Sequence, residues 1–426
     1  MKTKVTYTVA LLVALMLVVS PTQRTMAAPA KQTGPTTWTV LVGSEAELQP
    51  VQHGQAGVWQ IMKFYPDNLT INVGDTIDFK LNSPEPHTVL FLAPGAQAPQ
   101  IFVPQQNPSG PPSIYANPEV FLPSGGPTFD GTATSGAGQL GGEPTNPKEY
   151  KLTFTKAGSF GYFCSFHSGL NPQTNKIEGM TGNVVVQDAS TAYPKSVDQV
   201  NSDAQAAIAT DQANVVKGEP DVQKLAQATR PGPNGTTIYQ VNVGGMNMAV
   251  GADYMRFYPS ELTVHAGDTV EWVWHGLPHT VTFASGGKEP DLILPQPQPN
   301  GPPKLLSNPQ IAFPVGGKVY NGAGLFNSGT PLNPTNADGS PVTYMLTFSK
   351  PGKYEYICSF HDQEGMVGHI TVLAAMSSGG QAGGSQPMMP QTGSGSADGF
   401  GWLLALALLT ISLGVALKRR IVAQVG

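Results

Sequence analysis

Residues 356–366 read YICSFHDQEGM, and the rest of the chain is organised around this stretch. Cys358, His361 and Met366 lie within nine residues of one another, directly after an alternating run typical of a strand. A loop that leaves a strand can turn a thiolate, an imidazole and a thioether towards one ion. Soft sulfur ligands with imidazole favour copper, and two His, one Cys and a weak axial Met are typical of blue-copper sites. We expect the missing histidine to be His279, in the run PHTV.

The same arrangement occurs a second time, nearer the N-terminus. The core CSFH recurs at residues 164–167, the triplet EGM at 178–180 and the run PHTV at 86–89. These repeats offer a second set of the same four side chains, namely His87, Cys164, His167 and Met180.

A longer repeat indicates that the whole domain is duplicated. Residues 62–76 read MKFYPDNLTINVGDT and residues 255–269 read MRFYPSELTVHAGDT, with nine of fifteen positions identical. Each copy is typical of two strands followed by a tight turn at Gly-Asp.

With these motifs in place, both halves resemble the cupredoxins of the plastocyanin and azurin type. The resemblance covers residues 37–187 and 237–373, and four ligand types appear in the family's order in each. It implies an all-β fold of two Greek-key β-sandwich domains and one type 1 copper ion in each domain. The ligands it implies are His87, Cys164, His167 and Met180 in the first domain, and His279, Cys358, His361 and Met366 in the second.

The same resemblance implies supporting roles for four neighbours of these ligands. Thr88 and Thr280 follow the strand histidines, at a position that hydrogen-bonds to the ligand loop in plastocyanin-like proteins. Phe166 and Phe360 stand where plastocyanins often have proline, and we expect them to exclude water, which tunes the potential of a metal site.

The two ligand loops differ in length. In the first half, residues 168–177 add ten residues before the shared EGM triplet. We expect this polar segment to bulge outward and to hold Met180 more loosely than Met366 is held, because a longer loop is easier to displace. Two distinguishable copper sites follow from this difference.

Two Gly/Pro-rich insertions lie between the first histidine and the cysteine of each half, at about residues 92–149 and 284–342. Such long segments of low periodicity are unusual unless they are functional. We interpret them as lids over the sandwiches, with a partner-docking surface as the alternative.

Residues 188–236 are predicted to form a helical linker between the domains. Val197, Val200, Ala204 and Ile208 recur at helical spacing. Gly218 and Pro220 are expected to end this helix, and Pro231 to end a second one.

The N-terminus is typical of a secretory signal, residues 1–30. Lys2 and Lys4 precede an apolar run from Val9 to Val19, and small residues at 28–30 favour cleavage after Ala30. An uncleaved anchor is the alternative. Secretion across the membrane is therefore the predicted localisation.

The C-terminus is predicted to attach the protein to the cell surface. A flexible Ser/Gly-rich linker, residues 374–399, contains MPQTG at 389–393, which resembles the LPxTG sortase signal with Met in place of Leu. Residues 400–417 are apolar and the tail at 418–426 begins with three basic residues. A single transmembrane helix is the alternative to sortase-type attachment to the cell wall.

Composition sets further limits. Only 12% of residues are charged, and 49 Gly and 39 Pro favour strands and turns over long charged helices. The net charge of −5 and the lack of a basic run exclude nucleic acid as an expected partner. Cys164 and Cys358 occupy the same position in two repeats, so we expect no disulfide between them.

These features predict an extracytoplasmic electron-transfer protein that meets redox partner proteins and is not an enzyme. A copper oxidase or nitrite reductase is a weaker alternative. Such enzymes need further copper, which is held by His-x-His pairs or by a His adjacent to the Cys. The sequence has neither feature. Copper storage or delivery is another alternative, although the Met-rich segment contains only Met376, Met388 and Met389.

Overall fold

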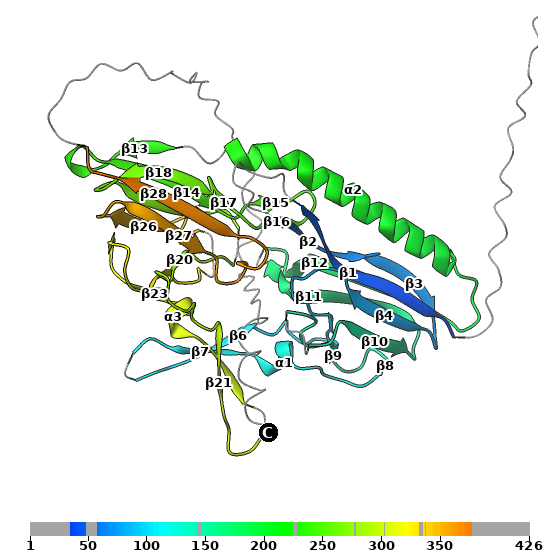
Figure 1. Ribbon diagram of the computed structural model, residues 1–426. Coiled ribbons are helices and arrows are strands. Elements are labelled where there is room, and N and C mark those ends of the chain that lie inside the picture. The colour runs from blue at the N-terminus through cyan, green and yellow to red at the C-terminus, as the bar shows by residue number, and fades with distance from the viewer. Residues whose placement is uncertain are drawn as a thin grey trace, which may run out of the picture.

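The computed structural model describes residues 35–376, apart from 48–57, 109, 143–145, 172, 225–227, 277, 302, 332–334 and 337. Strands predominate, and they form two β-sandwiches that lie side by side (Figure 1). The prediction of a mostly β chain is confirmed. The predicted signal segment and the segments from residue 377 onward lie outside the described residues. Among the described helices, none has the length and apolar character needed to cross a membrane.

The first sandwich consists of a seven-stranded and a five-stranded sheet. The seven-stranded sheet contains, in spatial order, β15 (Met246–Asn247), β16 (Ala252–Tyr254), β2 (Val58–Tyr65), β1 (Thr37–Glu47), β4 (Thr76–Leu81), β10 (Glu149–Phe154) and β8 (Thr128–Phe129). The five-stranded sheet contains β3 (Asn68–Asn72), β12 (Lys176–Gln187), β11 (Gly158–Asn171), β5 (Leu90–Phe91) and β9 (Ser135–Gly136).

The second sandwich repeats this plan with two six-stranded sheets. One contains β13 (Thr229–Pro231), β14 (Thr237–Val243), β19 (Thr269–Trp274), β26 (Thr343–Phe348) and β24 (Val319–Tyr320), with β17 (Phe257–Tyr258) paired to β14. The other contains β18 (Glu261–His265), β28 (Val367–Leu373), β27 (Gly352–Ile357), β20 (Thr282–Phe283), β25 (Phe326–Ser328) and β23 (Pro314–Val315). A 3-10 turn, η1 (Pro233–Gly235), precedes β14.

Alternating side chains build an equivalent aromatic core in each sandwich. The burial pattern is the same along β10 and β26, with the apolar positions inward. In the first core the Phe79 and Tyr162 rings, from opposite sheets, lie 5.2 Å apart in an edge-to-face arrangement. Trp272 and Tyr356 make the corresponding contact at 5.4 Å in the second. Such pairs stabilise a core beyond the area they bury, so each strand that carries a ligand starts from a rigid base.

The two sandwiches share a sheet. β15 and β16 come from the second half of the chain, but β16 pairs with β2 of the first half, with Asp253 opposite Gln60 and Tyr254 opposite Trp59. Backbone hydrogen bonds of a sheet therefore cross the domain boundary and fix the two sandwiches against each other.

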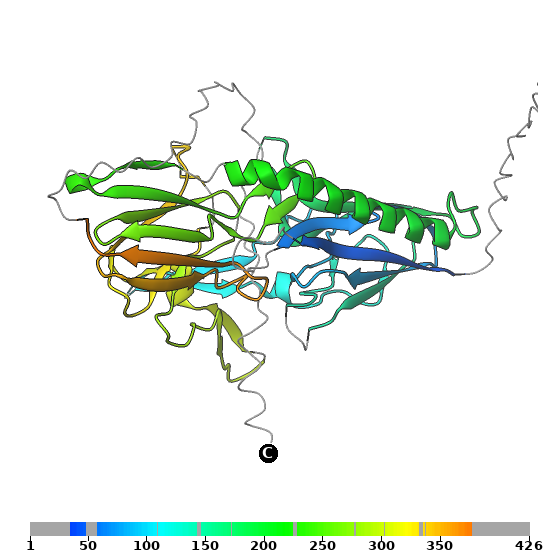
Figure 2. The ribbon, with the colours of Figure 1, turned by 45° about the horizontal axis from the view of Figure 1, so that its top comes forward.

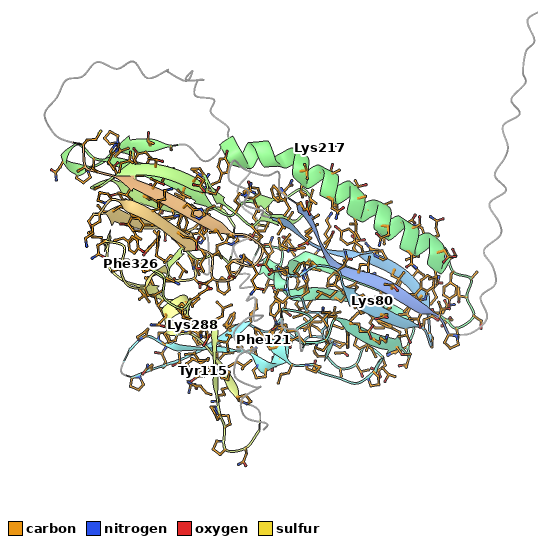
Figure 3. All side chains as sticks on the ribbon, viewed as in Figure 1. Lys80, Tyr115, Phe121, Lys217, Lys288 and Phe326 are labelled. Carbon is orange, nitrogen blue, oxygen red and sulfur yellow. The ribbon has the colours of Figure 1, made fainter. Side chains whose placement is uncertain are left out.

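The two insertions meet and form a sheet of their own. β6 (Phe102–Gln105) and β7 (Ser113–Ala116) come from the first insertion, and β21 (Ile293–Gln296) and β22 (Lys304–Ser307) from the second. β7 pairs with β22, and the Tyr115 hydroxyl donates to Gln296 Oε1 at 3.1 Å (Figure 3). Short helices α1 (Pro118–Phe121) and α3 (Pro309–Ala312) follow β7 and β22. The interpretation of two separate lids is therefore incomplete, because the insertions also join the domains to each other.

The linker forms one long helix, α2 (Val197–Lys224), which lies along β1 and β2 (Figure 2). Ala204, Ile208 and Val215 are buried in a cluster with strand residues. The prediction that Gly218 and Pro220 end the helix is wrong, and so is the second helix, since residues 229–231 form β13. The turns before these residues pack on β1 and β2, and this packing supports the helix as a whole. Gly218 instead permits a close approach, because a Cβ there would lie 2.9 Å from Nδ2 of Asn247.

Candidate metal centres

The first site brings together three side chains from distant parts of the chain. Cys164 Sγ lies 3.3 Å from His167 Nδ1 and 3.7 Å from His87 Nδ1. All three residues are buried. Their ligand atoms lie within 4.8 Å of one another, which is close enough to share one metal ion.

The second site has the same composition and arrangement. Cys358 Sγ lies 3.4 Å from His361 Nδ1 and 3.8 Å from His279 Nδ1, and the two Nδ1 atoms are 3.0 Å apart. These residues are also buried. Both cysteines are free, as expected of residues in two different domains. Each triad therefore contains the three residues that the sequence predicted.

The ligand loop of the second site is a tight turn held by the backbone. The Cys358 N–H donates to the carbonyl of Met366 at 3.0 Å, and the Met366 N–H donates to the carbonyl of His361 at 2.9 Å. Met366 is completely buried in the same apolar cluster as Cys358. The loop thus brings the backbone of Met366 next to that of Cys358 and His361.

The longer loop of the first site does not bulge outward. Its residues continue the two strands, with Ser168 paired to Gly179 and Asn171 to Lys176. The irregularity lies instead at residues 164–167, which bulge opposite the single residue Met180. Met180 is buried with Cys164, and its carbonyl accepts a hydrogen bond from the Ser168 hydroxyl at 2.8 Å. A paired hairpin is stiffer than a free loop, so the expectation of loose placement had the wrong physical basis.

The threonines after His87 and His279 connect the cysteine to the segment that leads into β5 or β20. The backbone N–H of Thr88 donates to Cys164 Sγ at 3.3 Å, and that of Thr280 donates to Cys358 Sγ at 3.4 Å. The Thr88 hydroxyl oxygen accepts the N–H of Ser165 at 2.6 Å. Hydrogen bonds of this kind stabilise a thiolate and orient the loop that carries it.

Phe166 and Phe360 are buried beside the ligands, as the sequence indicated. Phe121 of the first insertion, labelled in Figure 3, packs on Phe166, and the two ring centroids are 5.3 Å apart. This contact explains how the insertion also covers its site, since it adds a second aromatic layer between the cysteine loop and water.

The chemistry of the donor atoms fits copper. Burial raises the pKa of the Cys164 thiol to about 11, so the thiol is protonated at pH 7 and a metal ion that binds there must displace the proton. Burial lowers the pKa of His167 to about 3, although Asp253 acts in the opposite direction, and the imidazole is neutral at pH 7. Burial and the neighbouring histidines lower the pKa of His361 as well. Neutral imidazole and thiolate are the forms that bind copper.

The strand histidines have different partners at their outer nitrogens. His87 Nε2 lies 3.0 Å from the Ser83 hydroxyl, whereas His279 Nε2 lies 3.2 Å from the buried carboxylate of Asp253. Burial alone lowers the pKa of His279, but Asp253 outweighs this effect and raises it to about 10. Sequence reasoning missed both partners. Neither Ser83 nor Asp253 is repeated in the other half of the chain, where His275 and Gln60 stand at the equivalent positions.

The loop histidines share a third partner that the sequence analysis also missed. Glu85 is fully buried, with Oε1 3.8 Å from His167 Nε2 and Oε2 3.8 Å from His361 Nε2. It stands two residues before His87, so proximity to a ligand was the only available signal.

A glycine with positive φ makes room for each strand histidine. Gly43 has φ of 74° and Gly244 has φ of 64°. A Cβ at Gly43 would overlap His87 Nε2, and a Cβ at Gly244 would overlap the ring of His279. The backbone at the register shift within β1 and the backbone directly after β14 therefore pack on the imidazoles.

The fold and the two triads define a two-domain copper-binding β-sandwich protein. The chain belongs to the copper binding proteins of the plastocyanin/azurin family, whose model matches residues 54–187 and 244–373.

Relatives and solved structures of similar fold each match about one third of the chain. The chloroplastic plastocyanin of Tetradesmus obliquus is 27% identical over 160 residues, which cover 37% of this chain and 86% of the relative. That of Hordeum vulgare is 26% identical over 147 residues, covering 34% and 68%. The oxidised plastocyanin of Dryopteris crassirhizoma is 19% identical, with a TM-score of 0.18 and coverage of 35% and 99%. A purple cupredoxin from Nitrosopumilus maritimus is 20% identical, with a TM-score of 0.17 and coverage of 32% and 98%.

Proposed function

We propose that this chain is an extracytoplasmic electron-transfer protein that holds two type 1 copper ions. The observation that carries the proposal is the pair of buried Cys-His-His triads, each with a buried methionine in the same apolar cluster. Two triads built alike on two sandwiches favour one shared chemistry, which for this donor set is the exchange of single electrons.

The residues would hold the metal as follows. Cys164 and Cys358 would supply thiolates, the four histidines would supply Nδ1, and Met180 and Met366 would supply weak thioether ligands. Bound copper supplies a centre that gains and loses one electron. Aromatic layers at Phe166 and Phe360 exclude water, and the Thr88 and Thr280 N–H groups fix the sulfur atoms. Rigid ligands move little when the charge changes, which favours fast transfer.

The location and the partners are part of the proposal. The N-terminal basic and apolar run supports export, and the C-terminal apolar run with its basic tail supports attachment to the membrane or cell wall. Copper centres covered by insertions suit an electron carrier that meets redox partner proteins rather than an enzyme that must admit a substrate.

An absorption spectrum of the copper-loaded protein tests the proposal. We expect an intense visible band from charge transfer between thiolate and copper, and bleaching by a one-electron reductant. Cys164→Ser combined with Cys358→Ser is the matched control and should give a colourless protein. A copper-loaded wild-type protein without this band would contradict type 1 copper and favour copper storage or delivery instead.

A further inference from the structure

Glu85 lies between the two metal centres. It belongs to the first domain, yet its two oxygens each lie 3.8 Å from the outer nitrogen of a loop histidine, His167 in its own domain and His361 in the other. The carboxylate and both imidazoles are buried, with exposed fractions of 0%, 4% and 0% for Glu85, His167 and His361. One side chain therefore touches a ligand of each site within a shared interior.

We propose that Glu85 couples the two copper centres, so that electrons pass between them within a single chain by way of His167, Glu85 and His361. This inference rests on the proposed function, because it requires two redox-active copper ions. It adds a route and a residue that the ligand sets do not contain.

The orientation of the histidines supports this role. Both loop histidines direct Nδ1 towards the cysteine sulfur, at 3.3 Å and 3.4 Å, which leaves Nε2 on the far side of each ring. A histidine that binds metal through one nitrogen usually donates the N–H of the other to a carboxylate, carbonyl or water. Here Nε2 of both rings faces the same carboxylate at 3.8 Å, which is an ion-pair distance and longer than a hydrogen bond. Since an ionised carboxylate has two acceptor oxygens, Glu85 can serve both rings at once.

The interface holds this arrangement in place. β16 extends the sheet of the first domain beside the sites, and β7 pairs with β22 where the insertions meet. Two separate strand pairings thus resist movement of one sandwich against the other.

The duplication argues against a role for Glu85 within its own domain alone. Features that serve one site, such as Thr88 and Thr280, occur in both halves. The position of Glu85 before PHTV is occupied by Leu277 in the second half. A carboxylate that links the two sites needs to be present only once in the chain, because one side chain contacts both loop histidines.

The electron balance of the step is simple. One electron leaves the reduced centre and reduces the oxidised one, and no atom is transferred. Glu85 remains a carboxylate, and each imidazole keeps its Nε2 proton. In a chain that carries one electron, no outside oxidant or reductant is needed.

The test compares Glu85→Gln with two other carboxylate variants in the full copper-loaded chain. We first record the copper content and both thiolate bands. We then rapidly add one electron equivalent of reductant per oxidised chain and follow how the electron redistributes between the two sites. Glu85→Gln should shift the potentials of both sites and slow the redistribution by about tenfold or more. Asp253→Asn removes a carboxylate that contacts His279 at 3.2 Å and acts on His167 only through its charge, so it should act chiefly on the second site. Glu45→Gln, whose carboxylate pairs with Gln60 at 3.2 Å, should change neither site.

Each alternative outcome overturns the coupling. Two intact blue bands with unchanged potentials and redistribution rate in Glu85→Gln would refute Glu85 as the link while leaving the proposed function in place. Fewer than two blue centres in the wild-type protein would refute both. If Glu85→Gln does not fold, Glu85→Asp keeps the charge but shortens the reach, and it should still slow the redistribution. A wild-type redistribution rate that rises with protein concentration would show transfer between chains and would also refute the proposal.

Discussion

Asp253 Oδ2 lies 3.2 Å from Nε2 of His279, so the second metal centre has a buried carboxylate directly behind a ligand. The corresponding nitrogen of His87 in the first centre faces the Ser83 hydroxyl at 3.0 Å. A carboxylate makes an imidazole a stronger electron donor than a hydroxyl does, because it polarises the N–H bond more strongly. The two centres therefore differ at their strand histidines as well as in the length of the ligand loop.

We predict that Asp253→Asn weakens Cu(II) binding at the second site by roughly 10- to 100-fold and raises its reduction potential. The carboxylate stabilises the more highly charged oxidised ion, so the wild-type second site should have the lower potential of the two. Competition with a copper chelator and a redox titration in the Cys164→Ser background measure both effects. Ser83→Ala in the Cys358→Ser background is the matched control and should have a much smaller effect.

Cys358→Ser should remove about half of the visible thiolate band and lower the copper content from about two ions per chain to about one. The remaining band belongs to the first site, because Cys164 lies in a separate triad. Cys164→Ser should leave the complementary half. Complete loss of colour in either variant would show that one site depends on the other for its integrity.

The sequence predicted the parts of each site that the two halves repeat. Both triads, the methionines and the threonines appear twice with the same neighbours, and duplication separates such positions from chance. Glu85, Asp253 and Ser83 each occur in one half only, and only the fold places each of them beside a ligand histidine. A comparison of one half with the other cannot identify such residues.

The sequence was less informative about segments whose structure depends on tertiary contacts. The Gly/Pro-rich insertions have little periodicity of their own, and their strands are stabilised by pairing across the two domains at Tyr115 and Leu306. Similarly, α2 continues past Gly218 and Pro220 although local preferences favour an earlier end, since its preceding turns pack on β1 and β2.

Thr88→Val should lower the free energy of unfolding of the first domain by about 1–3 kcal/mol in the copper-free protein. The substitution keeps the branched shape of the side chain but removes the oxygen that accepts the buried N–H of Ser165 at 2.6 Å. Urea denaturation measures the change. Thr88→Ser retains the hydroxyl and should be closer to the wild type, and equal losses in the two variants would contradict this explanation.

Gly43→Ala tests whether the backbone at the register shift within β1 positions the first copper ligand. The substitution combines two effects, because Gly43 has φ of 74° and its Cβ would overlap His87 Nε2. Gly95→Ala separates them, since Gly95 has a similar φ of 79° and its Cβ would meet nothing within 4 Å. Both variants introduce the same backbone strain, which costs on the order of 1 kcal/mol.

Only Gly43→Ala should displace His87, reduce the blue band by about half and lower the copper content towards one ion per chain. Gly244→Ala should do the same at the second site, where the Cβ would overlap the ring of His279. Equal spectra for Gly43→Ala and Gly95→Ala would show that the imidazole tolerates the added methyl group. Gly43 would then be needed only for the backbone conformation of β1.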